Sequence, residues 1–332
     1  MVNERKLIAF GPVPSRRLGK SLGINNIPPK ICSYSCIYCQ LGRTNNMQIN
    51  RGKFYKPEEI MHAVENKVKK AKKRGEPIDY LTFVPDGEPT LDINLGKEIG
   101  LLKSLSLEIK IAVITNSSLI WKEDVRDDLH KADWVSLKID AVSQGIWSRI
   151  NRPYGSLKLD KIQESISEFS HNFNGELATE TMLVQDVNDD TKEVERVADF
   201  IAGLNPKKSY ISIPTRPPAE KGVTPASEYE INMAYQIFKE RGIDAEYLIG
   251  YEGNAFAYIG NVEEDLLSIT SVHPMREEGM KEFLTKAKAN WSIIKKLIDE
   301  DRLIQVKYKD KKFYMRKLPR DKANHYGKMI DK

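Results

Sequence analysis

The three cysteines of this chain, Cys32, Cys36 and Cys39, all lie in one short stretch of the sequence. Thiolates are the ligands that iron–sulfur clusters and structural zinc sites select. A disulfide framework is disfavoured because three is an odd number and the N-terminus lacks the apolar core of a secretory signal. The closest histidine is His62, so a zinc site here would need a remote fourth ligand. The spacing therefore favours a [4Fe–4S] cluster with one iron open to a chelating small molecule.

The composition is typical of a soluble globular protein. Hydrophobic residues make up 40% of the 332 residues and charged residues 30%. No apolar run approaches the length of a membrane span. We therefore expect a cytoplasmic protein with no membrane partner, in a compartment that keeps thiols reduced. The length suits one α/β domain with a small appendage.

Predicted strands alternate with predicted helices along most of the chain. The first segment, 10–19, is rich in turn formers and carries paired arginines. Alternation of this kind indicates βα units and a parallel sheet. Six or seven units are too few for a closed eight-fold barrel, and they fit an open, partial (β/α)6 barrel over residues 1–250. The predicted strands are 21–26, 80–84, 108–114, 134–139, 176–184, 210–213 and 245–249, and helices are expected between them.

The CxxxCxxC spacing, with Tyr38 just before the last cysteine, resembles the radical S-adenosylmethionine (radical SAM) superfamily. That resemblance implies a partial barrel in which the open iron binds the amino and carboxylate groups of SAM. It also implies reductive cleavage of SAM to a 5′-deoxyadenosyl radical, with the electron supplied by a partner such as flavodoxin or ferredoxin. The alternatives are a chance grouping of cysteines and a zinc loop that borrows a distant ligand.

Polar residues follow several predicted strands, and in parallel βα folds the chemistry lies at these strand ends. Asp86-Gly87-Glu88 resembles the Gly-Gly-Glu motif that holds the SAM amino group, with Asp86 in place of the first glycine. Asn116 lies in a run that resembles Thr-Asn-Gly, and Ser136 has the place of a serine that contacts SAM in relatives. The resemblance thus implies that Tyr38, Gly87, Glu88, Asn116 and Ser136 help to seat SAM. Alternatively, Asp86-Gly87 is an ordinary turn.

Five further charged residues are candidates for contacts with the substrate. Arg16 and Arg17 could bind a carboxylate or phosphate, or alternatively backbone carbonyls. Lys138 and Asp140 could contact the ribose or the substrate, or alternatively form a strand-end salt bridge or a helix N-cap. Arg216, after the strand at 210–213, could meet a substrate anion, and the strand at 176–184 is expected to face the substrate.

The chain has no fourth cysteine. An auxiliary cluster would require more thiolates, so radical sulfur insertion and methylthiolation are disfavoured. The methyl-carrying cysteine of the RNA adenosine methylases is also missing. The runs 11–19 and 39–44 resemble iron–sulfur oxidoreductases related to wyosine (tRNA-guanosine) synthases. True synthases of that kind use a second cluster, so the resemblance describes a single-cluster member and does not carry their activity across.

The last part of the chain, 273–332, is basic, with 17 Lys and Arg against 9 Asp and Glu. Two helices and a hairpin are expected at 276–289, 292–298 and 303–317, which resembles a small winged-helix domain after a linker at 251–272. Such a domain could bind nucleic acid, hold a peptide by strand addition, or pack two chains together. The leading hypothesis is a radical SAM enzyme acting on RNA. The alternatives are a protein or peptide substrate, and an iron–sulfur nucleic-acid sensor without turnover.

Overall fold

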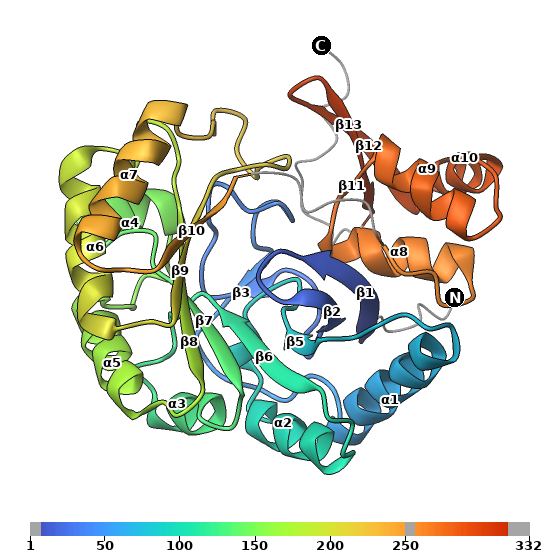
Figure 1. Ribbon diagram of the computed structural model, residues 1–332, viewed down its shortest axis with the longest axis horizontal. Helices are drawn as coiled ribbons and strands as arrows, with labels where there is room; N and C mark the ends of the chain where they lie inside the picture. The colour runs from blue at the N-terminus through green and yellow to red at the C-terminus, as the bar shows by residue number, and fades with distance from the viewer. Residues whose placement is uncertain (1–7, 250–255, 318–332) are drawn as a thin grey trace.

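An eight-stranded sheet forms the centre of the molecule in this computed structural model, which describes residues 8–249 and 256–317 (Figure 1). The strand order is β1-β2-β5-β6-β7-β8-β9-β10. Every pair from β2 to β10 is parallel, and only β1 runs antiparallel to its neighbour β2. The strands are β1 (Ala9–Ser15), β2 (Gly19–Ile24), β5 (Tyr80–Phe83), β6 (Lys110–Thr115), β7 (Trp134–Lys138), β8 (Glu176–Met182), β9 (Lys208–Ser212) and β10 (Ala245–Leu248). The parallel α/β architecture of a partial barrel is therefore confirmed.

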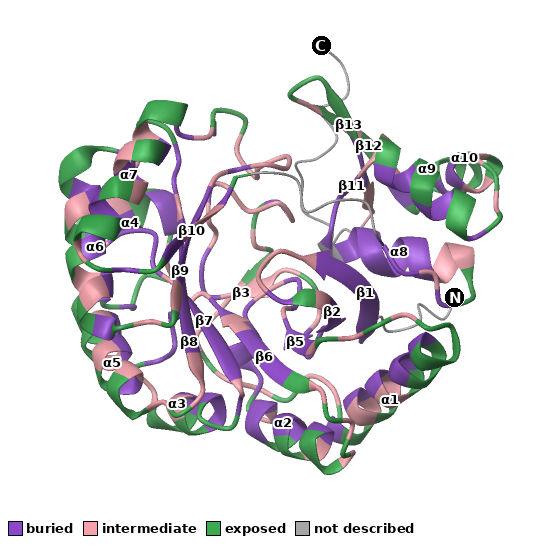
Figure 2. Ribbon diagram, in the orientation of Figure 1, coloured by how far each residue is buried: buried purple, intermediate pink, exposed green. Residues whose placement is uncertain are grey.

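Seven helices cover the convex face of the curled sheet (Figure 1). Each buries one apolar stripe, as Ile60, Val64 and Val68 do in the first of them, because residues four apart lie on one helix face. Figure 2 shows these buried stripes turned toward the sheet and the exposed faces turned outward. The helices are α1 (Pro57–Lys73), α2 (Leu95–Ser104), α3 (Glu123–Leu129), α4 (Gln144–Asn151), α5 (Leu159–Asn172), α6 (Thr191–Leu204) and α7 (Glu228–Glu240).

The turn-rich segment 10–19, for which the sequence predicted no strand, is mostly strand β1. The turn between β1 and β2 brings Leu18 against Trp134 and Tyr210 on the inner, helix-free face of the sheet. Side chains alternate across a strand, so these residues face away from their neighbours Val135 and Ile211, which pack with the helices. The hairpin thus fills the lower part of the barrel interior. Turn-forming residues hid it in the sequence, because glycine and proline are rare in central strands but tolerated at an edge.

The C-terminal part packs beside β1, and part of the predicted linker is helical. Helix α8 (Val262–Val272) lies within the predicted linker 251–272, and its Leu266 and Ile269 share a core with Phe10 of β1. Residues 250–255 and 318–332 of the predicted segments lie outside the described residues. After α8 come β11 (Met275–Arg276), α9 (Glu277–Lys286), α10 (Ser292–Asp299), β12 (Leu303–Tyr308) and β13 (Lys311–Arg316), with sheet order β11-β13-β12. The two helices and the hairpin are as expected, and the winged-helix assignment stays a prediction.

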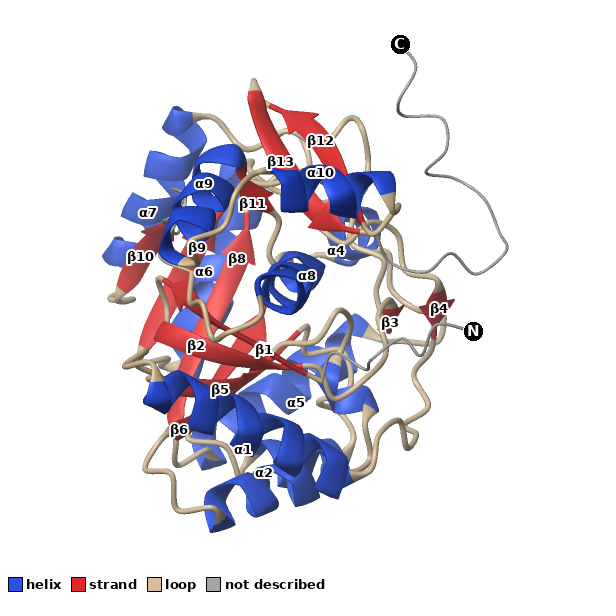
Figure 3. Ribbon diagram, turned by 90° about the vertical axis from the view of Figure 1, so that its right-hand side faces the viewer, coloured by secondary structure: helices blue, strands red, loops and turns tan. Residues whose placement is uncertain are grey.

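Figure 3 shows α8 seen nearly end-on, between the central sheet and the small sheet of the C-terminal part. We call α8 to β13, residues 262–316, the tail module. Within the described residues, no helix has both the length and the apolar composition needed to cross a membrane.

Candidate functional site

The cysteine loop lies between β3 (Ile31–Cys32) and β4 (Asn46–Met47), which pair with each other beside the carboxyl ends of the main strands. Cys32, Cys36 and Cys39 are half-buried and form no disulfide. Burial raises the pKa of all three thiols, that of Cys36 to about 12. Thiols of this kind stay protonated until a metal displaces the proton.

Two asparagine side chains reach the loop from distant parts of the chain. The amide Nδ2 of Asn116 lies 3.4 Å from Cys32 Sγ and donates to Ser33 Oγ at 2.9 Å. Asn151 Nδ2 lies 3.5 Å from Cys36 Sγ. Amide donors stabilise sulfur when it carries negative charge. The structure therefore brings the predicted residue Asn116 to the cysteine loop and adds Asn151, which the sequence analysis missed.

Gly87 permits a close approach, but to protein backbone. A Cβ at this position would lie 2.0 Å from the carbonyl oxygen of Ile31, directly before the first cysteine. Two backbone hydrogen bonds flank it: Glu88 N–H donates to Ile31 O, and Lys30 N–H donates to Asp86 O at 2.6 Å. The loop after β5 thus holds the cysteine loop by its main chain, and any larger residue at Gly87 would force the two apart.

Glu88 is almost wholly surrounded by protein donors. Its carboxylate oxygen Oε1 accepts from Thr90 N–H, Thr90 Oγ1 and Thr115 Oγ1, the last at 2.6 Å, and Oε2 accepts from Asn116 N–H at 2.7 Å. Burial raises the pKa of Glu88, whereas these hydrogen bonds act to lower it. Glu88 therefore braces the end of β5 against the end of β6.

Asp86, two residues earlier, is in the opposite situation. Its side chain is 2% exposed, yet Oδ1 has no hydrogen-bond partner. Burial raises its pKa to about 8, while the charges of Arg316 and Lys30 act to lower it. Asp86 also helps to raise the pKa of Cys39, so the two side chains are close enough to interact electrostatically. The sequence analysis treated Asp86 only as a departure from a glycine motif.

Tyr38 and Asp140 meet on the other side of the loop. The Tyr38 hydroxyl donates to Asp140 Oδ2, which also accepts from Asn151 Nδ2 at 2.7 Å. Asp140 Oδ1 accepts from Met182 N–H at 2.9 Å. The suggested N-cap role of Asp140 is not observed, because Ser143 holds the N-cap position of α4. Asp140 instead links the cysteine loop to the ends of β7 and β8.

A largely buried group of charged side chains lies on the inner, helix-free face of the sheet. Lys138 Nζ lies 3.0 Å from Glu180 Oε1, and Arg17 forms an ion pair with the other oxygen of Glu180. Burial lowers the pKa of Lys138, and Asp140 acts against that shift. Ser136 lies two residues before Lys138 and is therefore on the same face of β7, fully buried. Arg16 is half-buried.

Glu180 was not singled out from the sequence, although its strand was expected to face the substrate. The available signal was an acidic residue in the middle of a strand whose neighbours are buried. Such a residue usually needs a buried counter-charge. Arg17 and Lys138, both predicted site residues, supply it.

The loop between β9 and α7, residues 213–227, lies over the cysteine loop. Arg216 Nη1 donates to Gln40 Oε1 at 2.6 Å, next to the last cysteine, and its Nη2 lies 2.9 Å from His273 Nδ1 at the end of α8. Glu220 N–H donates to Ile37 O at 3.1 Å. The Glu220 carboxylate accepts two hydrogen bonds from Arg43, at 2.7 and 2.8 Å. Arg216 therefore joins the cysteine loop to the tail module.

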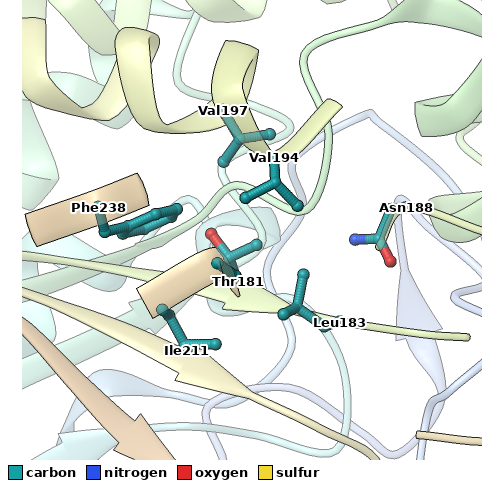
Figure 4. A pocket seen from close by; sticks show the side chains of 8 residues that line it. Thr181, Leu183, Asn188, Val194, Val197, Ile211 and Phe238 are labelled. Atoms are coloured by element: carbon teal, nitrogen blue, oxygen red, sulfur yellow. The ribbon is translucent and has the colours of Figure 1, made fainter. Parts of the chain in front are cut away.

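The described residues also enclose two small voids, one away from the site and one among its residues. One void lies on the helix side of the sheet and has essentially no room even for water. Figure 4 shows side chains that line it, among them Thr181, Leu183, Asn188, Val194, Val197, Ile211 and Phe238. A second void, beside Asn116, Lys138 and Asp140, has room for about one water molecule. The candidate site is thus defined by the strand ends and the cysteine loop, and not by these voids.

The donor set fits an iron–sulfur cluster. Three thiols come from one loop, and two of them have an amide donor at the sulfur. Each thiolate of a [4Fe–4S] cluster binds a different iron, so the three sulfurs need not converge on one ion. In residues 8–249 and 256–317, no three His, Cys, Asp or Glu side chains converge in a way suited to a single metal ion.

Comparisons with known proteins agree with this chemistry. The family model of the radical SAM superfamily matches residues 26–201. A UPF0026 protein of Methanocaldococcus jannaschii is 52% identical over 95% of this chain and 98% of its own length. A probable dual-specificity RNA methyltransferase of Streptococcus pyogenes is 25% identical over 64% of this chain and 60% of its own. A solved radical SAM methyltransferase from Sphaerobacter thermophilus has the same fold, with a TM-score of 0.53, 17% identity, and coverage of 69% of this chain and 66% of its own.

Proposed function

This chain belongs to the radical SAM superfamily of enzymes, and we propose that it uses a [4Fe–4S] cluster to cleave SAM and abstract hydrogen from RNA. The observation that carries the proposal is the loop with Cys32, Cys36 and Cys39, held against the strand ends by the backbone of the loop after β5. The superfamily prediction is confirmed by the family match. The cluster type, the substrate and the reaction are the proposed parts.

Each part of the site has a task in this proposal. When bound, the reduced cluster would supply one electron to the sulfonium of SAM, giving methionine and a 5′-deoxyadenosyl radical. Cys32, Cys36 and Cys39 would hold the cluster, and Asn116 and Asn151 would stabilise charge on two of the sulfurs. A flavodoxin or ferredoxin would serve as the electron donor.

The remaining residues would exclude water and orient the ligand. The loop 213–227 covers the cysteine loop, and its Glu220 pairs with Arg43 and Arg152 to hold it there. Ser136 and the Lys138–Glu180–Arg17 group lie deeper in the barrel, where they would set the polarity around the adenosine or substrate. Tyr38 is fixed by Asp140, so its ring has one orientation beside the last cysteine.

RNA is the substrate we favour. One relative is an RNA methyltransferase by name, and the tail module is rich in lysine. Arg216 at the strand ends contacts His273, so a substrate bound by the tail module would lie near the cysteine loop. The chain lacks the extra cysteine that carries a methyl group in RNA adenosine methylases, so a different reaction on RNA is proposed.

One observation favours a peptide substrate as the second candidate. In the order β11-β13-β12, strand β12 is an edge strand of the small sheet, and an edge can accept an added peptide strand. The two candidates differ in their dependence on salt. RNA binding should weaken steeply as salt rises, by about 0.7 log units per phosphate contact for each tenfold increase, whereas strand addition should respond little.

The test is anaerobic reconstitution with iron and sulfide. We expect about four irons per chain, a change in the electron paramagnetic resonance (EPR) spectrum of the reduced protein when SAM is added, and formation of 5′-deoxyadenosine. Stoichiometric zinc with no effect of SAM would contradict the proposal. A cluster that binds nucleic acid but never cleaves SAM would instead support the sensor alternative.

A further inference from the structure

The loop after β5 carries two buried carboxyl groups with opposite surroundings. Both oxygens of Glu88 accept hydrogen bonds from the protein: three donors on one oxygen and one on the other. Asp86 is equally buried, but its Oδ1 has no partner. A buried carboxyl oxygen without a donor costs free energy, and groups of this kind in a native site are expected to have a ligand.

We propose that Asp86, and not Glu88, is the carboxylate that accepts hydrogen bonds from the ammonium group of bound SAM. This inference rests on the proposed function and assigns the ligand's amino-acid end to particular residues. The motif that this loop resembles has glycine where Asp86 stands, so the role belongs to this chain's own sequence. Glu88 then acts as the brace between β5 and β6.

The position of Asp86 fits a ligand that chelates the open iron. Its carboxyl group influences the pKa of Cys39, and its backbone carbonyl accepts from Lys30 N–H, two residues before the first cysteine. In this inference, the ammonium group of the bound ligand meets Asp86 beside the cysteine loop. A buried carboxylate close to three thiolates also costs free energy unless a cationic group lies nearby.

The surrounding charges suit an amino-acid zwitterion. The charges of Lys30 and Arg316 both act to lower the pKa of Asp86. In this inference, the carboxylate of the ligand faces these cations while its ammonium meets Asp86. Arg316 lies on β13, so the tail module contributes one of these charges. This arrangement predicts that replacing Asp86 weakens binding of the amino-acid end of SAM and not of its adenine.

The experiment compares ligand affinity in the reconstituted full chain with Asp86→Asn, Asp86→Gly and Glu88→Gln. The ligands are SAM, decarboxylated SAM, which keeps the ammonium group, and 5′-methylthioadenosine, which lacks the whole amino-acid end. A hydrogen bond between charged groups is expected to change affinity by about 10- to 100-fold. Both Asp86 variants should therefore bind SAM and decarboxylated SAM that much more weakly, with iron content and affinity for 5′-methylthioadenosine unchanged.

Glu88→Gln should give the complementary result. It should lower the thermal stability of the protein without SAM, because it disturbs four hydrogen bonds, and its assembled fraction should bind SAM within about threefold of the original chain. Asp86→Asn should leave that thermal stability unchanged or raise it, because it removes a buried carboxyl group whose Oδ1 has no hydrogen-bond partner.

The outcomes separate the inference from the proposed function. If the original chain forms no cluster or binds no SAM, the proposed function fails. If it binds SAM and both Asp86 variants bind it equally well, the inference about Asp86 is overturned. It is also overturned if Glu88→Gln, with intact cluster, loses SAM binding while the Asp86 variants keep it. Affinity is measured per assembled cluster, so partial cluster loss in one variant does not obscure the result.

Discussion

The strand-end site and the hairpin of the tail module both carry many charges, but in different settings. At the site, charged groups are buried and meet partners far away in the sequence, as Arg17 does with Glu180. On the hairpin, lysines are exposed and pair with acids of the same module, as Lys307 does with Asp310 and Lys312 with Glu277. Desolvation makes the first kind of charge expensive and the second kind cheap.

This difference indicates which charged residues are candidates for function. The excess of lysine in the tail was the basis for expecting a polyanion-binding surface. In the structure several of those lysines have acidic neighbours, including Lys311 beside Glu278 and Lys317 beside Asp301. The buried charges at the strand ends are fewer, yet each is held in a costly environment. A count of charges along a sequence does not distinguish these cases.

The largest effect should come from the cysteine loop. Replacing Cys36 with alanine should reduce the iron content from about four per chain to near zero and abolish SAM cleavage, because one of three cluster ligands is lost. Iron analysis and the yield of 5′-deoxyadenosine measure this. If this variant keeps both its cluster absorbance and the formation of 5′-deoxyadenosine, the cysteine loop does not hold the cluster.

The next effect concerns the buried ion pairs. Glu180→Gln would leave Arg17 and Lys138 facing each other without their shared counter-charge, and should lower the free energy of unfolding by about 3 kcal/mol. Urea denaturation measures the change. The matched control is Glu176→Gln on the same strand, whose pair with Lys110 is exposed, and which should have a much smaller effect. Equal losses of stability at the two positions would show that burial does not make the ion pairs of Glu180 more stabilising than that of Glu176.

A pH-dependent change in stability is expected from Glu98 and Asp92, which lie beside each other. Burial raises the pKa of Glu98 to about 9 from its ordinary 4.5, and that of Asp92 to about 6. Between these ordinary and raised values the folded protein keeps a proton that the unfolded chain has released. Stability should therefore fall as pH rises from about 5 to 9, by up to about 1.4 kcal/mol per pH unit for one proton.

Glu98→Gln should flatten this dependence, because an amide supplies a permanent donor to Asp92 and does not titrate. Urea denaturation at pH 5, 6.5 and 8 measures the slope for both proteins. The variant should gain stability relative to the original chain as pH rises. Parallel stability curves would show that the pair does not hold the extra proton.

The smallest effect should come from the hairpin. Replacing Lys309, Lys311 and Lys312 with alanine should reduce the salt dependence of RNA binding by at most about 2 log units per tenfold change in salt, since each phosphate contact contributes about 0.7. SAM cleavage without RNA should be unchanged. Unchanged RNA affinity and salt slope would leave the hairpin without a role in binding and favour the peptide candidate. Deleting the tail module is a poor substitute, because α8 and α9 share a core with β1.

The sequence by itself determined the chemistry and the architecture in outline. Cysteines three and four residues apart must lie on one loop whatever the rest of the chain does, because covalent geometry limits their separation. The alternation of strands and helices likewise depends on local periodicity, and it predicted the parallel sheet from β2 to β10.

Tertiary structure decided which polar residues have partners. The turn-rich sequence of β1 did not predict a strand, and only its packing against α8 and β2 makes it one. Glu88 and Asp86 are two residues apart and chemically alike, yet Thr115 and Asn116 of β6 and its following loop satisfy only Glu88. Two of the four hydrogen bonds to Glu88 come from these residues distant in the sequence, so local pattern cannot assign them. For the same reason, the spacing of the cysteines located the site, and the fold alone showed which carboxylate in it has an oxygen without a hydrogen-bond partner.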